Sequence, residues 1–225
     1  MPFSRIHIKT LAKRVRAAEA REPVDEEGQG GDALGYTTIE ALQEQFKTPV
    51  WKEELDDESS ILRKLLAHPS FSAGEEGQIS VNAILAMGLL HSVGEGNEKA
   101  WVCYSMLQEG GLEAQGQISA SDKDYVKVMD TLFAMSTTSL FSILSDVSTI
   151  EHGVSEDDVA ALEENFTTVR EDQVIDPIYG DNSRLEAAIW HEKLLTSELD
   201  KLLFNSSNLR EAIFKSAEID EKWTA

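Results

Sequence analysis

Apolar residues recur at intervals of three and four along most of this chain, which is the spacing of one face of an α-helix. The first clear helix start is Thr37-Thr38-Ile39-Glu40, where the Thr hydroxyl and the Glu carboxylate satisfy free N–H groups, and Pro49 ends this helix. Further periodic stretches predict helices near residues 61–66, 84–93, 101–107, 125–133, 155–166, 184–204 and 207–223. Stretches that alternate with period two are nearly absent, so the sequence predicts an all-α fold.

The chain has 225 residues, a length that suits one domain with extensions. Residues 1–21 form a basic amphipathic segment, and residues 22–36 are acidic, rich in Gly and without periodicity, which predicts a flexible linker. The folded body is expected from about Tyr36 onward. Within it, residues 37–150 form the helical core and residues 151–225 form additional C-terminal helices.

The N-terminal segment carries six basic residues against Glu19 alone, around an apolar stripe of Ile8, Leu11, Val15 and Ala18. Four roles remain open for it: a solvated helix, a docking helix for an acidic partner or for the chain's own body, a membrane-surface helix, and a mitochondrial import segment. Because a polar linker follows, removal of residues 1–30 is expected to leave the fold intact.

The overall charge limits the classes of partner. The chain has 20 basic and 41 acidic residues, a formal net charge of −21, so its body is expected to repel nucleic acid. Its longest apolar stretches are too short to span a membrane, so membrane association is expected only through residues 1–21. The single cysteine, Cys103, excludes an internal disulfide framework and favours an intracellular location, the cytoplasm first and the mitochondrion as the alternative.

No catalytic motif is present in the sequence. The five histidines are scattered, and neither a zinc-protease, a serine-hydrolase nor a P-loop pattern occurs. Cys103 lies between Val102 and Tyr104 on a predicted half-buried helix, which predicts an inert thiol. The sequence therefore predicts a protein that is not an enzyme, with no catalytic residue, no cofactor and no metal.

Two short segments resemble each other, Gly77-Gln78-Ile79-Ser80 and Gly116-Gln117-Ile118-Ser119, at a separation of 39 residues. Each lies between two predicted helices. The pattern resembles the second half of an EF-hand calcium loop, in which Gly makes a sharp turn, the apolar residue bridges to the neighbouring loop, and Ser caps the next helix. The resemblance implies a paired EF-hand-like lobe in a multi-helix orthogonal array, with loops at residues 72–83 and 111–122 and with Ile79 opposite Ile118.

The ligand positions of these loops depart from the EF-hand pattern. Calcium needs several oxygen ligands and a bidentate carboxylate at the last loop position. The first loop supplies Ser72, Gly74, Glu76 and Ser80, with Ala83 last; the second supplies Gly111, Glu113, Gln115 and Ser119, with Asp122 last. The resemblance is therefore to a degenerate pair that binds no calcium. A weaker similarity links the chain to the EF-hand-like helical region of TLDc-domain proteins.

These observations predict a non-catalytic adaptor or regulatory subunit that binds a protein partner, expected to be an amphipathic helix. The candidate groove residues are large, adaptable apolar side chains: Met87, Trp101, Met106, Met129, Phe133 and Met135. For each of them, burial in the core is the competing interpretation. Two functional alternatives remain: a calcium-responsive sensor with atypical loops, and an organellar complex subunit with an N-terminal import segment.

Overall fold

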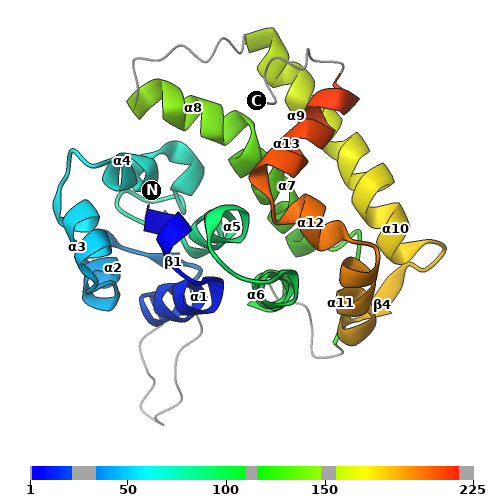
Figure 1. The fold of residues 1–225 in the computed structure, drawn as a ribbon, viewed down its shortest axis with the longest axis horizontal. Coiled ribbons are helices and arrows are strands. Elements are labelled where there is room, and N and C mark those ends of the chain that lie inside the picture. Colours follow the sequence, from blue (N-terminus) through cyan, green and yellow to red (C-terminus); the bar gives the residue numbers. More distant parts are fainter. Residues whose placement is uncertain (1, 22–33, 110–115, 148–155, 218–225) are drawn as a thin grey trace.

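The computed structural model describes residues 2–21, 34–109, 116–147 and 156–217 (Figure 1). Its elements in chain order are η1 (Pro2–Arg5), α1 (Ile8–Ala17), β1 (Tyr36–Thr37), α2 (Ile39–Gln45), α3 (Pro49–Asp56), α4 (Ile61–Ala67), η2 (Pro69–Phe71), β2 (Ile79–Ser80), α5 (Val81–His91), α6 (Gly96–Glu109), β3 (Gln117–Ser119), α7 (Lys123–Ser136), α8 (Thr138–Val147), α9 (Glu156–Arg170), η3 (Glu171–Ile175), α10 (Asp176–Tyr179), β4 (Arg184–Glu186), α11 (Ala187–Thr196), α12 (Leu199–Leu203) and α13 (Ser206–Ser216). The predicted all-α class is confirmed.

The strands form two short antiparallel pairs, and their register corrects the predicted contact between Ile79 and Ile118. Strand β1 pairs with β2, which places Thr37 opposite Ile79. Strand β3 pairs with β4, which places Ile118 opposite Leu185. The prediction was wrong because two further segments, β1 and β4, supply the partners, so each isoleucine is bridged within its own half of the chain.

Each of the four strands leads directly or within a few residues into a helix, and glycines with positive φ precede the first three. Gly35, Gly77 and Gly116 have φ values of 73°, 80° and 64°, in the left-handed region that glycine adopts without steric cost. Thr38 and Ser80 then cap α2 and α5. Each side chain accepts a hydrogen bond from the backbone N–H three residues later in the chain, that of Ala41 and that of Ala83 respectively. The fold thus contains four helix–strand–helix units joined in two β-pairs.

The basic segment at the N-terminus is part of the core, which corrects the expected start of the folded body near Tyr36. In α1 the apolar stripe predicted from the sequence faces inward, and Ile8, Leu11 and Val15 are completely buried. Helix α1 packs on α2, α5 and α6 (Figure 1). The two helices α1 and α5 are in close contact at Gly88, where an added Cβ would lie 2.2 Å from Leu11 Cδ2. Of the roles left open for residues 1–21, docking on the chain's own body is the one observed.

The predicted helix over residues 184–204 is three elements in the structure. Its first residues form β4, and Glu198, with φ of 56°, separates α11 from α12. Helix α13 then packs on α7 and α9 and buries Leu209, Ile213 and Phe214. Residues 218–223 of the predicted last helix lie outside the described residues.

Candidate functional site

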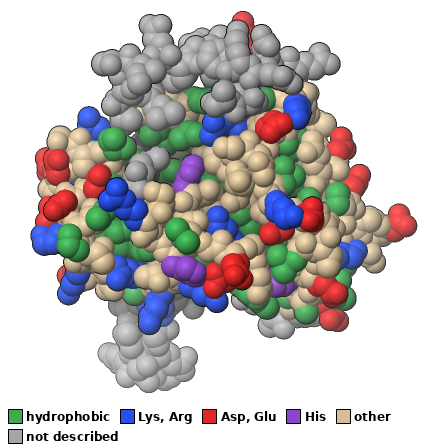
Figure 2. Space-filling model, in the orientation of Figure 1, with side chains coloured by type: hydrophobic (Ala, Val, Ile, Leu, Met, Phe, Trp, Pro, Cys, Tyr) green, Lys and Arg blue, Asp and Glu red, His purple; other side chains and the backbone are tan. Residues whose placement is uncertain are grey.

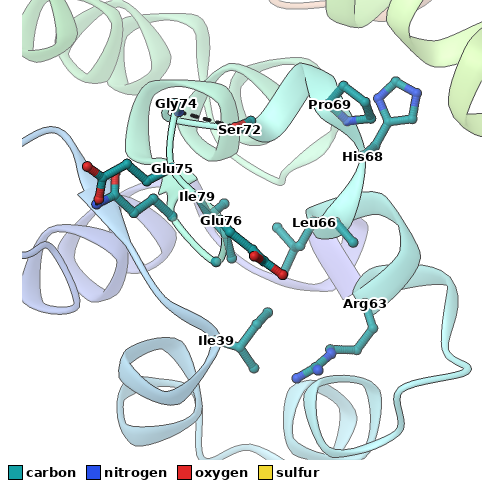
Figure 3. A pocket seen from close by; sticks show the side chains of 13 residues that line it. Ile39, Arg63, Leu66, His68, Pro69, Ser72, Gly74, Glu75, Glu76 and Ile79 are labelled. Atoms are coloured by element: carbon teal, nitrogen blue, oxygen red, sulfur yellow. Dashed lines mark hydrogen bonds between the residues drawn. The ribbon is translucent and has the colours of Figure 1, made fainter.

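A cavity of about 480 Å³ opens beside the β1–β2 pair (Figure 3). Its walls come from the first residue of α2, from Arg63, Leu66 and Ala67 of α4 and from the segment 68–79. In Figure 3 the side chains of Ile39, Leu66 and Ile79 face a common space, and the Glu76 carboxylate points into it. Arg63 extends its guanidinium toward Ile39 from another side. The cavity therefore has an apolar floor and charged groups of both signs at its rim.

The loop that forms one wall is fixed by its own backbone. Ala73 N–H donates to Gln78 O at 3.1 Å, and Gln78 N–H donates to Glu75 O at 3.1 Å. Gly74 and Gly77 have φ values of 116° and 80°, backbone conformations that residues other than glycine rarely adopt. Because these bonds close the loop on itself, the wall is formed before any ligand arrives.

The polar residues at the rim are partly committed to the protein itself. Arg63 donates from its guanidinium to Leu55 O at 3.3 Å, and it lies 3.9 Å from the exposed carboxylate of Glu58. His68 accepts the N–H of Ser70 through Nδ1 at 3.2 Å, and its Nε2 lies 2.9 Å from Ser142 Oγ. Because Nδ1 accepts a hydrogen bond, the neutral ring of His68 carries its proton on Nε2, which then donates to Ser142 Oγ and does not take a proton from it.

The first predicted calcium loop, residues 72–83, lies along this wall, and two of its candidate ligand oxygens, those of Ser72 and Ser80, already have structural roles. Ser72 Oγ accepts the N–H of Gly74 at 3.2 Å, and Ser80 Oγ accepts the N–H of Ala83 at 3.2 Å. Residues 111–115 of the second predicted loop, residues 111–122, lie outside the described residues. In its described part, Asp122 accepts the N–H of Ser119 at 2.9 Å and caps the turn before α7. Within the described ranges, no cluster of three or more His, Cys, Asp or Glu side chains is arranged to hold a metal ion.

The predicted partner-binding residues do not form one exposed groove. Five are buried in the core: Met87, Met106, Met129, Phe133 and Met135. Trp101 is 49% exposed on α6, and its ring stacks on His191 of α11 with the ring centroids 4.4 Å apart. Trp101 is therefore the one predicted residue that a partner can reach without a rearrangement of the core.

Two further expectations from the sequence concern the reactivity of Cys103 and the absence of a membrane-spanning segment. Cys103 is buried, and its burial raises the pKa of the thiol to about 12, so it carries no thiolate near neutral pH. Figure 2 shows basic and acidic side chains interspersed on one face, with apolar side chains between them. Among the helices that the structure describes, none has the length and apolar content to cross a membrane.

Sequence reasoning missed the strands that complete each pair. For β1 a signal was present, because Gly35-Tyr36-Thr37-Thr38 repeats the order of Gly, any residue, β-branched residue and hydroxyl residue found in the two recognised segments. For β4 the equivalent segment, Ser183-Arg184-Leu185-Glu186, has Ser in place of Gly. Only a capping-box pattern marked it, which predicts a helix start and not a strand.

Comparisons of the chain with protein-family models, with curated proteins and with solved structures found no match.

Proposed function

We propose that this chain is a non-catalytic adaptor or regulatory protein, built from EF-hand-like units, that binds a protein partner without calcium. The observation that carries the proposal is the preformed cavity beside the β1–β2 pair, with its apolar floor of Ile39, Leu66 and Ile79 and its rim of Arg63 and Glu76. A cavity of this kind suits an apolar anchor side chain of a partner helix, with charged residues of the partner meeting the rim.

The arrangement of the four units supports the EF-hand-like part of the proposal. In tandem EF-hands, two loops bridge through short antiparallel strands, with Gly at loop position 6 and helices on either side. Here Gly35 and Gly77 occupy that position in one pair, and Gly116 occupies it in the other. The similarity extends from the two segments recognised in the sequence to both β-pairs.

The residues at the last loop position support independence from calcium. Counted from the glycine or its equivalent, this position holds Ala41, Ala83, Asp122 and Ile189 in the four units. Three of the four have no carboxylate, and Asp122 already accepts the backbone N–H of Ser119. Without a bidentate carboxylate, a calcium site loses its strongest ligand.

The burial of α1 bears on the alternative of an import segment. Cleavage of residues 1–21 would remove Phe3, Ile8, Leu11 and Val15, all fully buried, from the core. The same burial leaves the apolar stripe of α1 turned away from any membrane surface. The adaptor function is therefore proposed for the chain with α1 in place.

Two variants on the same exposed side of α4 test the cavity. Ala67→Trp places a large ring at a position that lines the cavity, whereas Lys64→Trp adds the same ring one turn earlier, outside it. Proteins captured from a cell extract by the wild type should be purified and their affinity measured by isothermal titration calorimetry. We expect Ala67→Trp to weaken the affinity at least tenfold and Lys64→Trp to leave it unchanged. Equal affinities for both variants would contradict the role of the cavity.

Calcium supplies the second test. With calcium at millimolar concentration, we expect no heat of binding and no change in melting temperature, because a ligand that binds only the folded state must stabilise it. A rise of several degrees that a chelator reverses would instead support the calcium-sensor alternative.

A further inference from the structure

A basic surface lies on the outer side of η1 and α1. The basic residues of these two elements are Arg5, Lys9, Lys13, Arg14 and Arg16, and neither element contains an acidic residue. The apolar stripe of α1 is buried, so its polar side faces outward, and Arg5, Lys9 and Lys13 are exposed. Figure 2 shows basic side chains gathered over this part of the molecule, at the lower left. The local charge is therefore opposite to the net charge of −21 that the whole chain carries.

Two exposed apolar side chains border the basic surface. Val93 is 56% exposed, and an isolated β-bridge pairs it with His7, directly before α1. Trp101 is 49% exposed on α6, three residues after Glu98 and so on the same side of that helix. The Lys9 ammonium group lies 3.0 Å from the Glu98 carboxylate, which brings α1 and this side of α6 together. Cationic and apolar side chains therefore share one outward surface.

Only part of the positive charge is neutralised. The Glu98 carboxylate pairs with Lys9 and also lies 3.0 Å from His7 Nε2. Within the part of the chain that the structure describes, Arg5 and Lys13 have no hydrogen-bond or ion-pair partner. An excess of positive charge thus remains available to an anionic partner.

We propose that the basic surface binds an anionic lipid bilayer, with Arg5, Lys9 and Lys13 near the charged headgroups and with Val93 and Trp101 among them. Lysine and arginine side chains next to a membrane are attracted by its anionic lipids. Tryptophan is favoured at the membrane interface because its ring is apolar and its N–H is a donor. Since the apolar stripe of α1 stays buried in the core, the helix lies on the bilayer without inserting into it.

The shape of the surface favours a bilayer over an acidic peptide. A peptide that binds through an anchor side chain needs a groove to receive it. Val93 and Trp101 instead project outward from different segments, and neither lines the cavity beside the β1–β2 pair. Projecting apolar groups suit a soft lipid surface that deforms around them.

The acidic remainder of the chain acts weakly at this surface. Figure 1 shows α9 and α10, whose outer residues include Glu163, Glu171 and Asp176, on the side of the molecule away from η1 and α1. The Debye length at physiological ionic strength is about 8 Å, so distant exposed carboxylates are largely screened. The charges within the contact therefore decide the attraction.

The test is cosedimentation of the full chain with two kinds of vesicle, one of phosphatidylcholine alone and one of equal parts phosphatidylcholine and phosphatidylserine. We expect binding to the anionic vesicles only, and its loss when the salt concentration is raised. On binding, tryptophan emission should shift to shorter wavelength, and Trp101→Phe should abolish the shift because the other described tryptophans, Trp51 and Trp190, are buried. Polyglutamate, added as a competitor, should release the protein only at concentrations that also act by screening.

Two lysine variants provide the matched control. Lys13→Gln should weaken binding to anionic vesicles about fivefold, the equivalent of about 1 kcal/mol for one lysine next to such a membrane. Lys123→Gln removes an exposed lysine from α7, outside the basic surface, and should leave the binding unchanged. Circular dichroism melts confirm that each variant is folded. The proposal is overturned if anionic vesicles bind no protein, if both kinds of vesicle bind equally, if both lysine variants have the same effect, if the emission shift persists in Trp101→Phe, or if polyglutamate binds the surface in preference to the vesicles.

Discussion

The contact between Gly88 of α5 and Leu11 of α1 tests whether the N-terminal helix packs on α5. The effect of Gly88→Ala on the free energy of unfolding should change sign when Leu11 is shortened. Gly88→Ala adds a methyl group whose position lies 2.2 Å from Leu11 Cδ2 and 3.3 Å from Ile8 Cδ1. Leu11 and Ile8 are completely buried, so neither side chain can move into solvent. Overpacking of this kind costs about 1–3 kcal/mol. Because Ala is favoured over Gly within a helix by about 1 kcal/mol, the net effect is a loss of about 1 kcal/mol.

The same substitution should have the opposite effect once Leu11 is shortened. Leu11→Ala alone should cost about 2–5 kcal/mol through lost burial and a cavity beside Gly88. In that background Gly88→Ala meets no clash, and it fills part of the cavity while keeping its helix preference. We therefore expect it to raise the free energy of unfolding by about 1 kcal/mol there, a coupling of about 2 kcal/mol between the two sites.

Urea unfolding followed by circular dichroism measures all four proteins of the cycle. As a control, Gly88→Ala combined with Ile213→Ala, on the distant helix α13, should give additive losses. If Gly88→Ala stabilises the wild type by about 1 kcal/mol, and adds to the effect of Leu11→Ala, then α1 does not pack on α5 as described.

Three further predictions follow from burial and register. Burial lowers the pKa of His91 to about 4, with Arg210 and Lys99 adding to the shift, so below pH 6.5 the unfolded chain binds a proton that the native state does not bind. The free energy of unfolding should therefore fall by about 2 kcal/mol between pH 7 and 5 because of this group. Urea unfolding of His91→Gln should show a fall smaller by that amount. Native Cys103 should resist a thiol reagent that labels it fully in urea, because it is buried with its pKa raised to about 12; rapid labelling of the folded protein would contradict this. A double-mutant cycle between Ile118 and Leu185 should give a coupling of at least about 0.5 kcal/mol, whereas Ile79 and Ile118 should lose stability independently; the reverse result would contradict the observed register.

Local signals in the sequence accounted for most of the helices, though not for α3, and for part of the candidate site. Ser80 caps α5 as its pattern predicted, because a cap depends on atoms within three residues, whereas α2 is capped by Thr38 and not by Thr37, the first residue of the predicted capping box. The Gly-x-Ile-Ser segments also marked two of the four strands correctly. The missing carboxylate at the last position of the first loop, which is Ala83, can likewise be read directly from the sequence.

Tertiary structure decided what local patterns leave open. The pairing of Ile118 with Leu185 and not with Ile79 depends on which segments the folded chain brings together, because a strand of only two or three residues has several possible partners. The stripe of α1 is equally compatible with solvent, membrane or core, and only the space beside Gly88 shows that it is core. Likewise Met129 and Trp101 look alike as groove candidates, but one is fully buried and the other is half exposed. An amphipathic pattern predicts that the apolar face of a helix is buried, and the rest of the fold determines what buries it.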